Sequence, residues 1–196
     1  MRTIIIAAFI LVFLCFSLYA QEVTWEIDKA HSSINFSISH MVISDVTGNF
    51  TQFDGEVIAP SEDFTNTKVN IIIKTASINT DNEDRDKHLR NEDFFNADKY
   101  PEITFNSRSF KKVNDKNYKI TGNLSMHGIV KPVVFDAKLK GLIKDPWGNT
   151  RAGFKATATI DRYDFEIVYN STLETGGLLI GKEVDVEVNI ELIKKK

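Results

Sequence analysis

The sequence predicts an all-β protein, an eight-stranded antiparallel barrel with one short helical insertion at about residues 81–98. Three observations support this prediction. Apolar and polar residues alternate over most of the chain after residue 22, turn-forming residues separate the alternating segments, and one charged segment has helical spacing instead. A barrel buries every apolar face and leaves no exposed edge strand. A two-sheet sandwich fits the alternation almost as well.

The alternation has the period of two that is typical of half-buried strands. Between residues 34 and 40, for example, the large side chains of Ile34, Phe36 and Ile38 are separated by small polar residues. The connectors 113–117 and 145–149 are rich in turn-forming residues, so we expect neighbouring strands to be antiparallel. The predicted strands lie near residues 32–42, 46–59, 67–78, 102–110, 117–127, 131–143, 151–162 and 182–193.

Residues 80 to 100 depart from the alternation. Thr80 and Glu83 have the spacing of a capping box, in which two side chains bond the free N–H groups at a helix start. Glu83 and Lys87 are opposite charges four residues apart, and so are Asp86 and Arg90. These features predict a short, mostly exposed helix, which the proline at position 101 ends before the next strand.

The first twenty residues have the pattern of a secretory signal peptide. Arg2 precedes an unbroken apolar run from 4 to 16, and Ala20 supplies a small residue before the polar chain begins. A permanent membrane anchor is the alternative, but the run is short for a membrane span of about 20 residues. We therefore expect cleavage of 1–20, a single domain over 21–196, and a periplasmic or secreted protein with no permanent membrane span.

Composition excludes several classes of protein. Cys15, the only cysteine, lies in the predicted signal peptide, so the mature chain would have no disulfide and no thiolate ligand or nucleophile. The formal net charge is −3 at pH 7, which gives no broad basic surface for nucleic acid. Stability must therefore come from the hydrophobic core.

The polar residues do not form a recognisable catalytic or metal-binding motif. The cluster 161–164, Asp-Arg-Tyr-Asp, divides between the two faces of a strand, which favours surface ion pairs over acid–base chemistry. No serine has a glycine-flanked elbow around it. No histidine pair has ligand spacing among His31, His40, His88 and His127. We expect no enzymatic activity, no metal site and no required cofactor.

The apolar faces of the strands define the candidate interior. An eight-stranded barrel either fills its interior with side chains or holds one small ligand, and the sequence alone leaves both open. Six cations could meet an anionic head group: Arg85, Arg90, Arg108, Lys131, Arg151 and Arg162. The inward candidates are Phe36, Ile38, Phe50, Phe53, Ile71, Ile73, Phe105, Leu124, Met126, Phe135 and Phe154, and Leu89, Phe94 and Phe95 would form a lid.

Five stretches, in order along the chain, resemble the YceI-like family of polyisoprenoid-binding, lipocalin-like periplasmic proteins. Two positions depart from the family's pattern: Ser39 stands where many relatives have a basic residue, and Glu166 where glycine is frequent. The stretches are IDKAHSSINFSISHMVISDVTGNF from Ile27, SINTDNEDRDKHLRNEDFFNADKYPEITF from Ser77, TGNLSMHGIVKPV from Thr121, KDPWGNTRAGFKATATIDRYDF from Lys144 and GGLLIGKEVDVEVNIEL from Gly176.

The resemblance implies a lipocalin-like barrel that holds a long-chain isoprenoid, or a fatty acid or amide, for transport, storage or sequestration. It also implies a possible homodimer. Two alternatives remain open at this point. One is a structural or stress-associated interaction protein with a filled core, and the other is an accessory of quinone- or haem-linked electron transfer.

Overall fold

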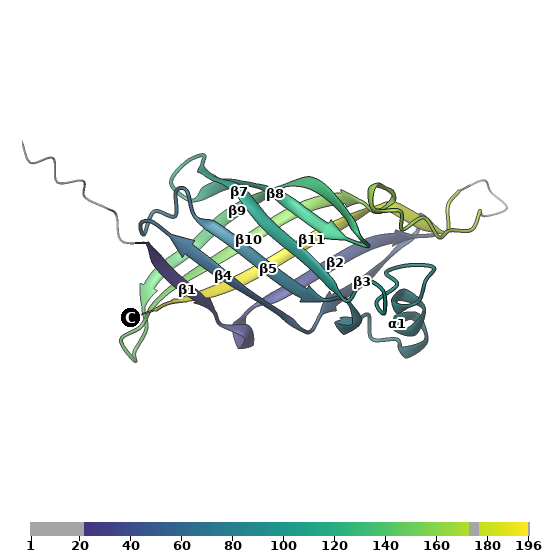
Figure 1. Ribbon diagram of the computed structural model, residues 1–196, viewed down its shortest axis with the longest axis horizontal. Coiled ribbons are helices and arrows are strands. Elements are labelled where there is room, and N and C mark those ends of the chain that lie inside the picture. The colour runs from purple at the N-terminus through teal and green to yellow at the C-terminus, as the bar shows by residue number, and fades with distance from the viewer. Residues whose placement is uncertain (1–21, 173–176, 196) are drawn as a thin grey trace, which may run out of the picture.

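The computed structural model describes residues 22–172 and 177–195, so the predicted signal peptide lies outside the described residues. Over these residues the chain forms an elongated barrel with one α-helix at one end (Figure 1). The elements are β1 (Val23–Ile27), η1 (Lys29–His31), β2 (Ser33–His40), β3 (Ser44–Phe50), β4 (Phe53–Ala59), β5 (Lys68–Lys74), η2 (Thr75–Ser77), β6 (Ile78–Asn79), α1 (Glu83–Arg90), β7 (Glu102–Lys112), β8 (Asn117–Met126), β9 (Ile129–Lys144), β10 (Thr150–Asp161), η3 (Arg162–Phe165) and β11 (Ile180–Lys194).

Eight of these strands form a closed ring. The order is β1-β4-β5-β7-β8-β9-β10-β11, and β1 pairs with β11 to close it. Every pairing is antiparallel, and β2, β3 and β6 continue the sheet from β11 beyond the ring. The prediction of an eight-stranded antiparallel barrel is therefore confirmed, and the sandwich alternative is wrong because the first and last strands of the ring are hydrogen-bonded to each other.

Two of the predicted strands differ in detail from the observed ones, and one observed strand was not predicted. Strand β1 was not among the predicted segments, and it is separated from β2 by η1, which Asp28 caps by accepting a hydrogen bond from Ala30 N. The predicted strand 46–59 breaks between β3 and β4, where Thr51 N and Gln52 N donate to Ser77 instead of to a strand. The predicted strand 67–78 breaks at η2, which ends at Ser77. The Ser77 hydroxyl donates to Lys74 O at 2.7 Å and accepts from Gln52 N, so it links this break to the one between β3 and β4.

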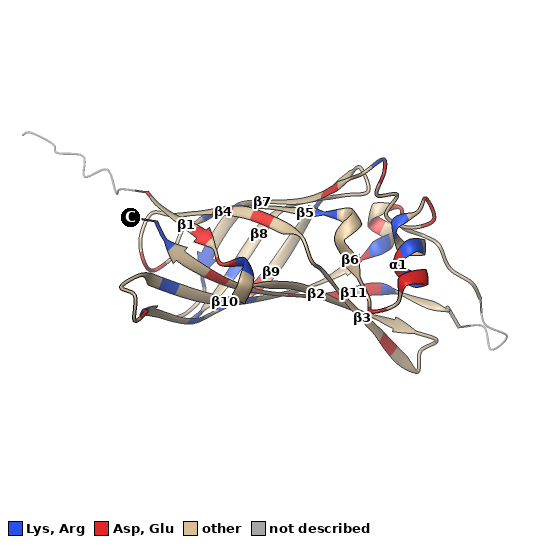
Figure 2. Ribbon diagram, turned by 90° about the horizontal axis from the view of Figure 1, so that it is seen from below, with Lys and Arg blue, Asp and Glu red and all other residues tan. Residues whose placement is uncertain are grey.

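The helix α1 is shorter than the predicted insertion, and its cap is a different residue. Asn82, not Thr80, is the N-cap and accepts a hydrogen bond from Arg85 N at 2.9 Å. Thr80 instead donates its hydroxyl to Asp86 Oδ1 at 2.6 Å, which holds the Asp86 carboxylate in the protein interior. Arg90 donates to Ile78 O at 3.3 Å rather than pairing with Asp86. Figure 2 shows α1, with its acidic and basic residues coloured on the ribbon, at one end of the barrel.

The end of the barrel away from α1 is filled by aromatic rings; we call it the closed end. The ring of Phe64, on the connection from β4 to β5, lies 5.1 Å from the ring of Trp25 and 4.9 Å from that of Phe154. Phe110 and Tyr118 pack 5.2 Å apart beside them, and the Tyr118 hydroxyl donates to Asp63 O at 2.8 Å. Trp25, Phe64, Phe110 and Tyr118 of this aromatic layer are all buried in the hydrophobic core.

A network of charges lies at the same end. Arg151 donates through Nε to Asp145 at 2.7 Å and through Nη1 to Asp28 and Glu191, at 2.7 and 2.6 Å. The hydrogen bonds from Arg151 and then His31 lower the pKa of Asp28 to about 2. Burial raises the pKa of Asp145, but hydrogen bonds from Arg151, Asn149 and Trp147 together outweigh it and hold the pKa at about 2. These contacts join Arg151 on β10 and Glu191 on β11 to Asp28, which follows β1, and to Asp145, in the turn between β9 and β10.

No helix in the described ranges, 22–172 and 177–195, has the length and the apolar composition needed to cross a bilayer.

Candidate ligand-binding cavity

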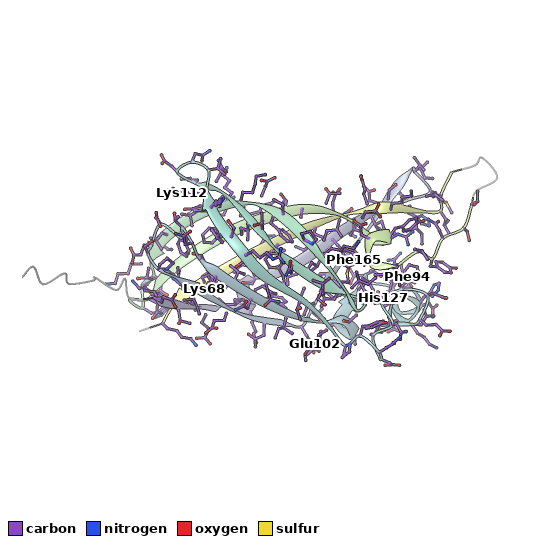
Figure 3. The ribbon with its side chains drawn as sticks, turned by 45° about the horizontal axis from the view of Figure 1, so that its top comes forward. Lys68, Phe94, Glu102, Lys112, His127 and Phe165 are labelled. Atoms are coloured by element: carbon purple, nitrogen blue, oxygen red, sulfur yellow. The ribbon has the colours of Figure 1, made fainter. Side chains whose placement is uncertain are left out.

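The barrel encloses a cavity of about 660 Å³. It extends from the aromatic layer of the closed end to α1, where it is lined by the exposed residue Asp84 and so reaches the protein surface. We call this end the mouth. In Figure 3, Lys68 and Lys112 mark the closed end, and Phe94, His127 and Phe165 lie together near the mouth.

The cavity is lined almost entirely by apolar side chains on the inward faces of the strands. The polar side chains are few, and all except Thr67 lie at the mouth, so a guest would meet hydrocarbon along its length and polar groups at one end. Those polar residues are Ser39, His40, Thr67, Asp84, Arg85, His88, Arg162 and Tyr169.

The inward candidates predicted from the sequence lie around this cavity, with one exception. Phe53 is absent from the lining: it lies opposite Ile73 on the inward face of the sheet, but its ring packs against the core cluster. The residues that line the cavity as placed are Phe36, Ile38, Phe50, Ile71, Ile73, Leu89, Phe94, Phe95, Phe105, Leu124, Met126, Phe135 and Phe154.

Two glycines explain how large rings line the wall without filling the interior. A Cβ atom added at Gly122 would lie 2.4 Å from Phe105 Cζ, and one added at Gly48 would lie 2.5 Å from Phe36 Cζ. Each ring therefore lies directly over a glycine on a neighbouring strand and flat against the wall. The interior is consequently filled by rings at the closed end and hollow towards the mouth.

An aromatic cluster covers part of the mouth. The His88 ring on α1 packs edge-on against Phe94 and Tyr169, with ring centres 4.9 Å apart in both pairs. His88 Nε2 also lies 2.9 Å from Asp93 Oδ2, which orients the imidazole. The cluster joins the helical insertion to the segment that follows η3. Tyr169 was missed by the sequence analysis, because the segment around it has no strand or helix pattern.

Arg162 has a different environment from the one predicted. The sequence pattern favours a surface ion pair for Arg162, but only 4% of this residue is exposed, and burial lowers the pKa of its guanidinium. Its Nη1 donates to Ile167 O at 2.6 Å and to Tyr169 O at 2.9 Å, and its Nε donates to Gly181 O at 2.8 Å. The alternation of β10 already places Arg162 on the face of Phe154 and Ile160, and the error arose because its charge was taken to favour the surface.

The six basic residues predicted as head-group partners differ in whether they lie at the cavity. Arg85 and Arg162 line the cavity, whereas Arg108 and Lys131 do not. Arg85 is held by Thr80, to whose hydroxyl and carbonyl oxygens it donates at 2.7 Å. Arg90 bonds the backbone of β6, and Arg151 belongs to the charge network at the closed end.

One group of side chains has a geometry that could hold a metal ion. Ligand atoms of Asp28, His31 and Glu191 lie within 4.8 Å of one another. Arg151 donates to both carboxylates of this group. Its guanidinium therefore already neutralises the negative charge that a metal ion would otherwise neutralise. The four histidines lie on separate elements or loops, and His127 bonds Phe165 O at 2.9 Å.

These features define a class of protein: an eight-stranded antiparallel barrel with an elongated, apolar internal cavity that has polar groups at a single mouth. Barrels of this size are wide enough to enclose one small ligand.

Comparison with known sequences identifies the family. The family described as YceI-like domain matches residues 25–192, and the chain belongs to it. Protein YceI of Shigella flexneri is 41% identical over 174 residues, which cover 88% of this chain and 87% of that protein. The resemblance found in the sequence is therefore confirmed.

Two solved structures have the same fold. The crystal structure of a YceI protein from Campylobacter jejuni matches with a TM-score of 0.70 and 33% identity, over 86% of this chain and 96% of that one. A polyisoprenoid binding domain from Saccharophagus degradans, implicated in plant cell wall breakdown, matches with a TM-score of 0.64 over 87% of this chain and 98% of that one. At 16% identity, this second match indicates the fold alone.

Proposed function

We propose that this protein binds the tail of a long-chain isoprenoid, or of a similar amphiphile such as a fatty acid or its amide, inside the barrel. Its role would be to transport, store or sequester that lipid in the periplasm. The observation that carries the proposal is the continuous apolar cavity of about 660 Å³ between the aromatic layer and the mouth. The domain from Saccharophagus degradans, which is described as polyisoprenoid-binding, supports this choice of ligand by analogy of fold.

The energetics of burial suit such a guest. Each buried methylene-sized carbon contributes about 0.8 kcal/mol, so a five-carbon isoprenoid unit contributes up to about 4 kcal/mol. Micromolar affinity corresponds to about 8 kcal/mol. About three or four buried units therefore suffice after the cost of ordering a flexible chain, and no charged anchor is required.

The arrangement of polar groups sets the direction of binding. The apolar tail is expected to enter first and to stop against Phe64 and Phe110, because Thr67 is the one polar residue that lines the cavity at the closed end within the described part of the chain. A head group would stay near Arg85 and His88 at the mouth, where its polar atoms keep hydrogen-bond partners. Catalysis plays no part in this proposal, and no cofactor is required.

The identity of the guest can be measured directly. Protein purified from the organism that produces it would be analysed by native mass spectrometry, and its extracted lipids would be identified by mass. We expect a non-covalent adduct with the mass of a long-chain lipid. Protein that remains free of lipid, and that takes up none when offered geranylgeraniol or palmitic acid, would contradict the proposal. Visible absorbance of the purified protein would instead indicate a quinone or haem guest.

Variants test whether the cavity is the binding site. Ile38→Trp and Met126→Trp each place a bulky ring in the cavity lining, so we expect a several-fold loss of bound lipid with the fold retained. Ile72→Trp is the matched control, because Ile72 is 43% exposed on the outer face of β5. Equal lipid content in the inward variants and the control would show that the tail binds elsewhere.

A further inference from the structure

The turn between β2 and β3 exposes three consecutive large apolar side chains. Met41 is 40% exposed, Val42 76% and Ile43 84%. Single exposed apolar residues are ordinary on a protein surface, but a run of three at the tip of a hairpin indicates contact with an apolar partner. Figure 2 shows this hairpin projecting beyond the body of the barrel.

The backbone conformation of the turn is unfavourable for large apolar residues. Ile43 N donates to His40 O at 3.2 Å, and the two residues between them have positive φ, 55° at Met41 and 64° at Val42. These are the φ signs of a type I′ turn, which prefers Asn-Gly, and a β-branched residue is strongly disfavoured there. The apolar side chains therefore do not stabilise the turn, and their presence requires a different explanation.

The exposed tip is continuous with the mouth of the cavity. Met41 N donates to Leu179 O at 2.8 Å, and Leu179 lines the cavity, as does the neighbouring His40. Three further exposed apolar residues lie on the segments next to this contact: Val168 at 57%, Tyr169 at 36% and Leu178 at 36%. We define Met41, Val42, Ile43, Val168, Tyr169 and Leu178 as the apolar rim.

We propose that the apolar rim docks on the surface of a phospholipid bilayer, with the Val42–Ile43 tip inserted among the lipids beside the mouth. This inference rests on the proposed function, because a lipid tail that moves from a bilayer through an adjoining mouth need not cross water. The charged side chains on the strands next to the tip are Asp45, Lys182 and Glu183, which give no excess of positive charge. Docking should therefore depend on apolar insertion and not on anionic lipid.

The opposite end of the barrel provides a matched control. Ile143 and Trp147, in and after the end of β9, are 62% and 78% exposed, so they offer similar apolar area. They lie beside the aromatic layer of the closed end, where the cavity does not open. Docking that serves lipid exchange should use the rim and not this surface.

The test is flotation of the folded protein with neutral vesicles of phosphatidylcholine and phosphatidylethanolamine. The rim variant combines Val42→Asn with Ile43→Thr; asparagine tolerates positive φ, so the variant is expected to fold at least as well as the wild type. We expect the partition of the protein onto vesicles to fall by about ten-fold in the rim variant, since two apolar side chains leave the bilayer. The control variant, Ile143→Thr with Trp147→Ser, should float like the wild type.

Each other outcome overturns the inference. Absence of wild-type flotation, equal flotation of the rim variant, or an equal loss in the control variant would each exclude docking through the rim. A dimer of the wild type that the rim variant no longer forms would assign the rim to a second copy of the chain.

Loading with a soluble fluorescent fatty acid separates this inference from the proposed function. The rim variant should bind that probe with wild-type affinity and acquire lipid from vesicles about ten-fold more slowly. If wild type and variant both fail to bind the probe, the proposed function fails. If both bind it and acquire lipid from vesicles equally fast, only the docking inference fails.

Discussion

The two ends of the barrel are made from the same strands but are built differently. At the closed end the rings of Trp25, Phe64 and Phe154 contact one another, and the charges around Arg151 tie distant segments together. At the mouth, rings such as Phe36 and Phe105 lie flat over glycines, and the space between the walls stays empty. The comparison shows that one core cluster does both jobs, because most of its buried residues also line the cavity. Only a few of them, such as Trp25 and Tyr118, pack behind the lining.

The largest expected effect comes from breaking the closed end. Trp25→Ala removes a fully buried ring that does not line the cavity, so we expect the free energy of unfolding to fall by about 3–5 kcal/mol. Urea denaturation measures the loss, and the lipid bound per folded molecule should stay near the wild-type value. Loss of lipid binding at temperatures where the variant is fully folded would show that the two ends are not independent.

A second variant pushes an aromatic ring of the wall into the cavity. In Gly122→Ala the new methyl group would meet Phe105 Cζ at 2.4 Å and Asn106 O at 2.6 Å, so the ring must move into the cavity. We expect a destabilisation of about 1–3 kcal/mol, as for other overpacked sites, together with weaker lipid binding. Gly141→Ala is the control, because a Cβ at that position meets nothing within 4 Å. Unchanged binding in Gly122→Ala would mean that the guest does not reach Phe105.

Acid pH tests the charge network at the closed end. The pKa values of Asp28 and Asp145 are lowered from 3.8 to about 2, so the carboxylates stabilise the fold above their unfolded pKa and this contribution is lost as the pH falls from 3.8 towards 2. The Tm should therefore drop across this window. Arg151→Gln should have a lower Tm at pH 7 and a flatter profile below pH 4, since it removes the main partner of both groups. Parallel profiles for variant and wild type would contradict this assignment.

The smallest effect is expected at the mouth. Glu166 ends η3 with a φ of 57°, a left-handed conformation that glycine adopts more easily. Glu166→Gly should therefore raise the free energy of unfolding by at most about 1 kcal/mol, because the relief of strain is partly offset by the greater freedom of the unfolded chain. Thr157→Gly, within β10, should destabilise instead. A destabilised Glu166→Gly would show that the Glu166 side chain makes a contact that outweighs its backbone strain.

Local pattern was enough to predict the barrel and most of the cavity lining. The reason is that side chains in a strand alternate between faces whatever the strand pairs with, so Ile38, Ile71 and Met126 could be assigned inward from parity alone. Parity gave the face of a side chain but not its final contacts. Phe53 lies opposite the lining residue Ile73, yet its ring packs against the core cluster instead of the cavity. Arg162 shares the parity of the lining residues Phe154 and Ile160, although its charge favoured a surface position.

The sequence by itself determined the fold class, the inward faces and the position of the helical insertion. Only the tertiary structure decided which end is filled and which is hollow, because that depends on contacts between residues far apart in the chain. Phe64 reaches Phe154, and Arg151 bonds Asp28, only once the barrel has closed. The volume left inside is what remains after such distant side chains have packed, and no local pattern records it.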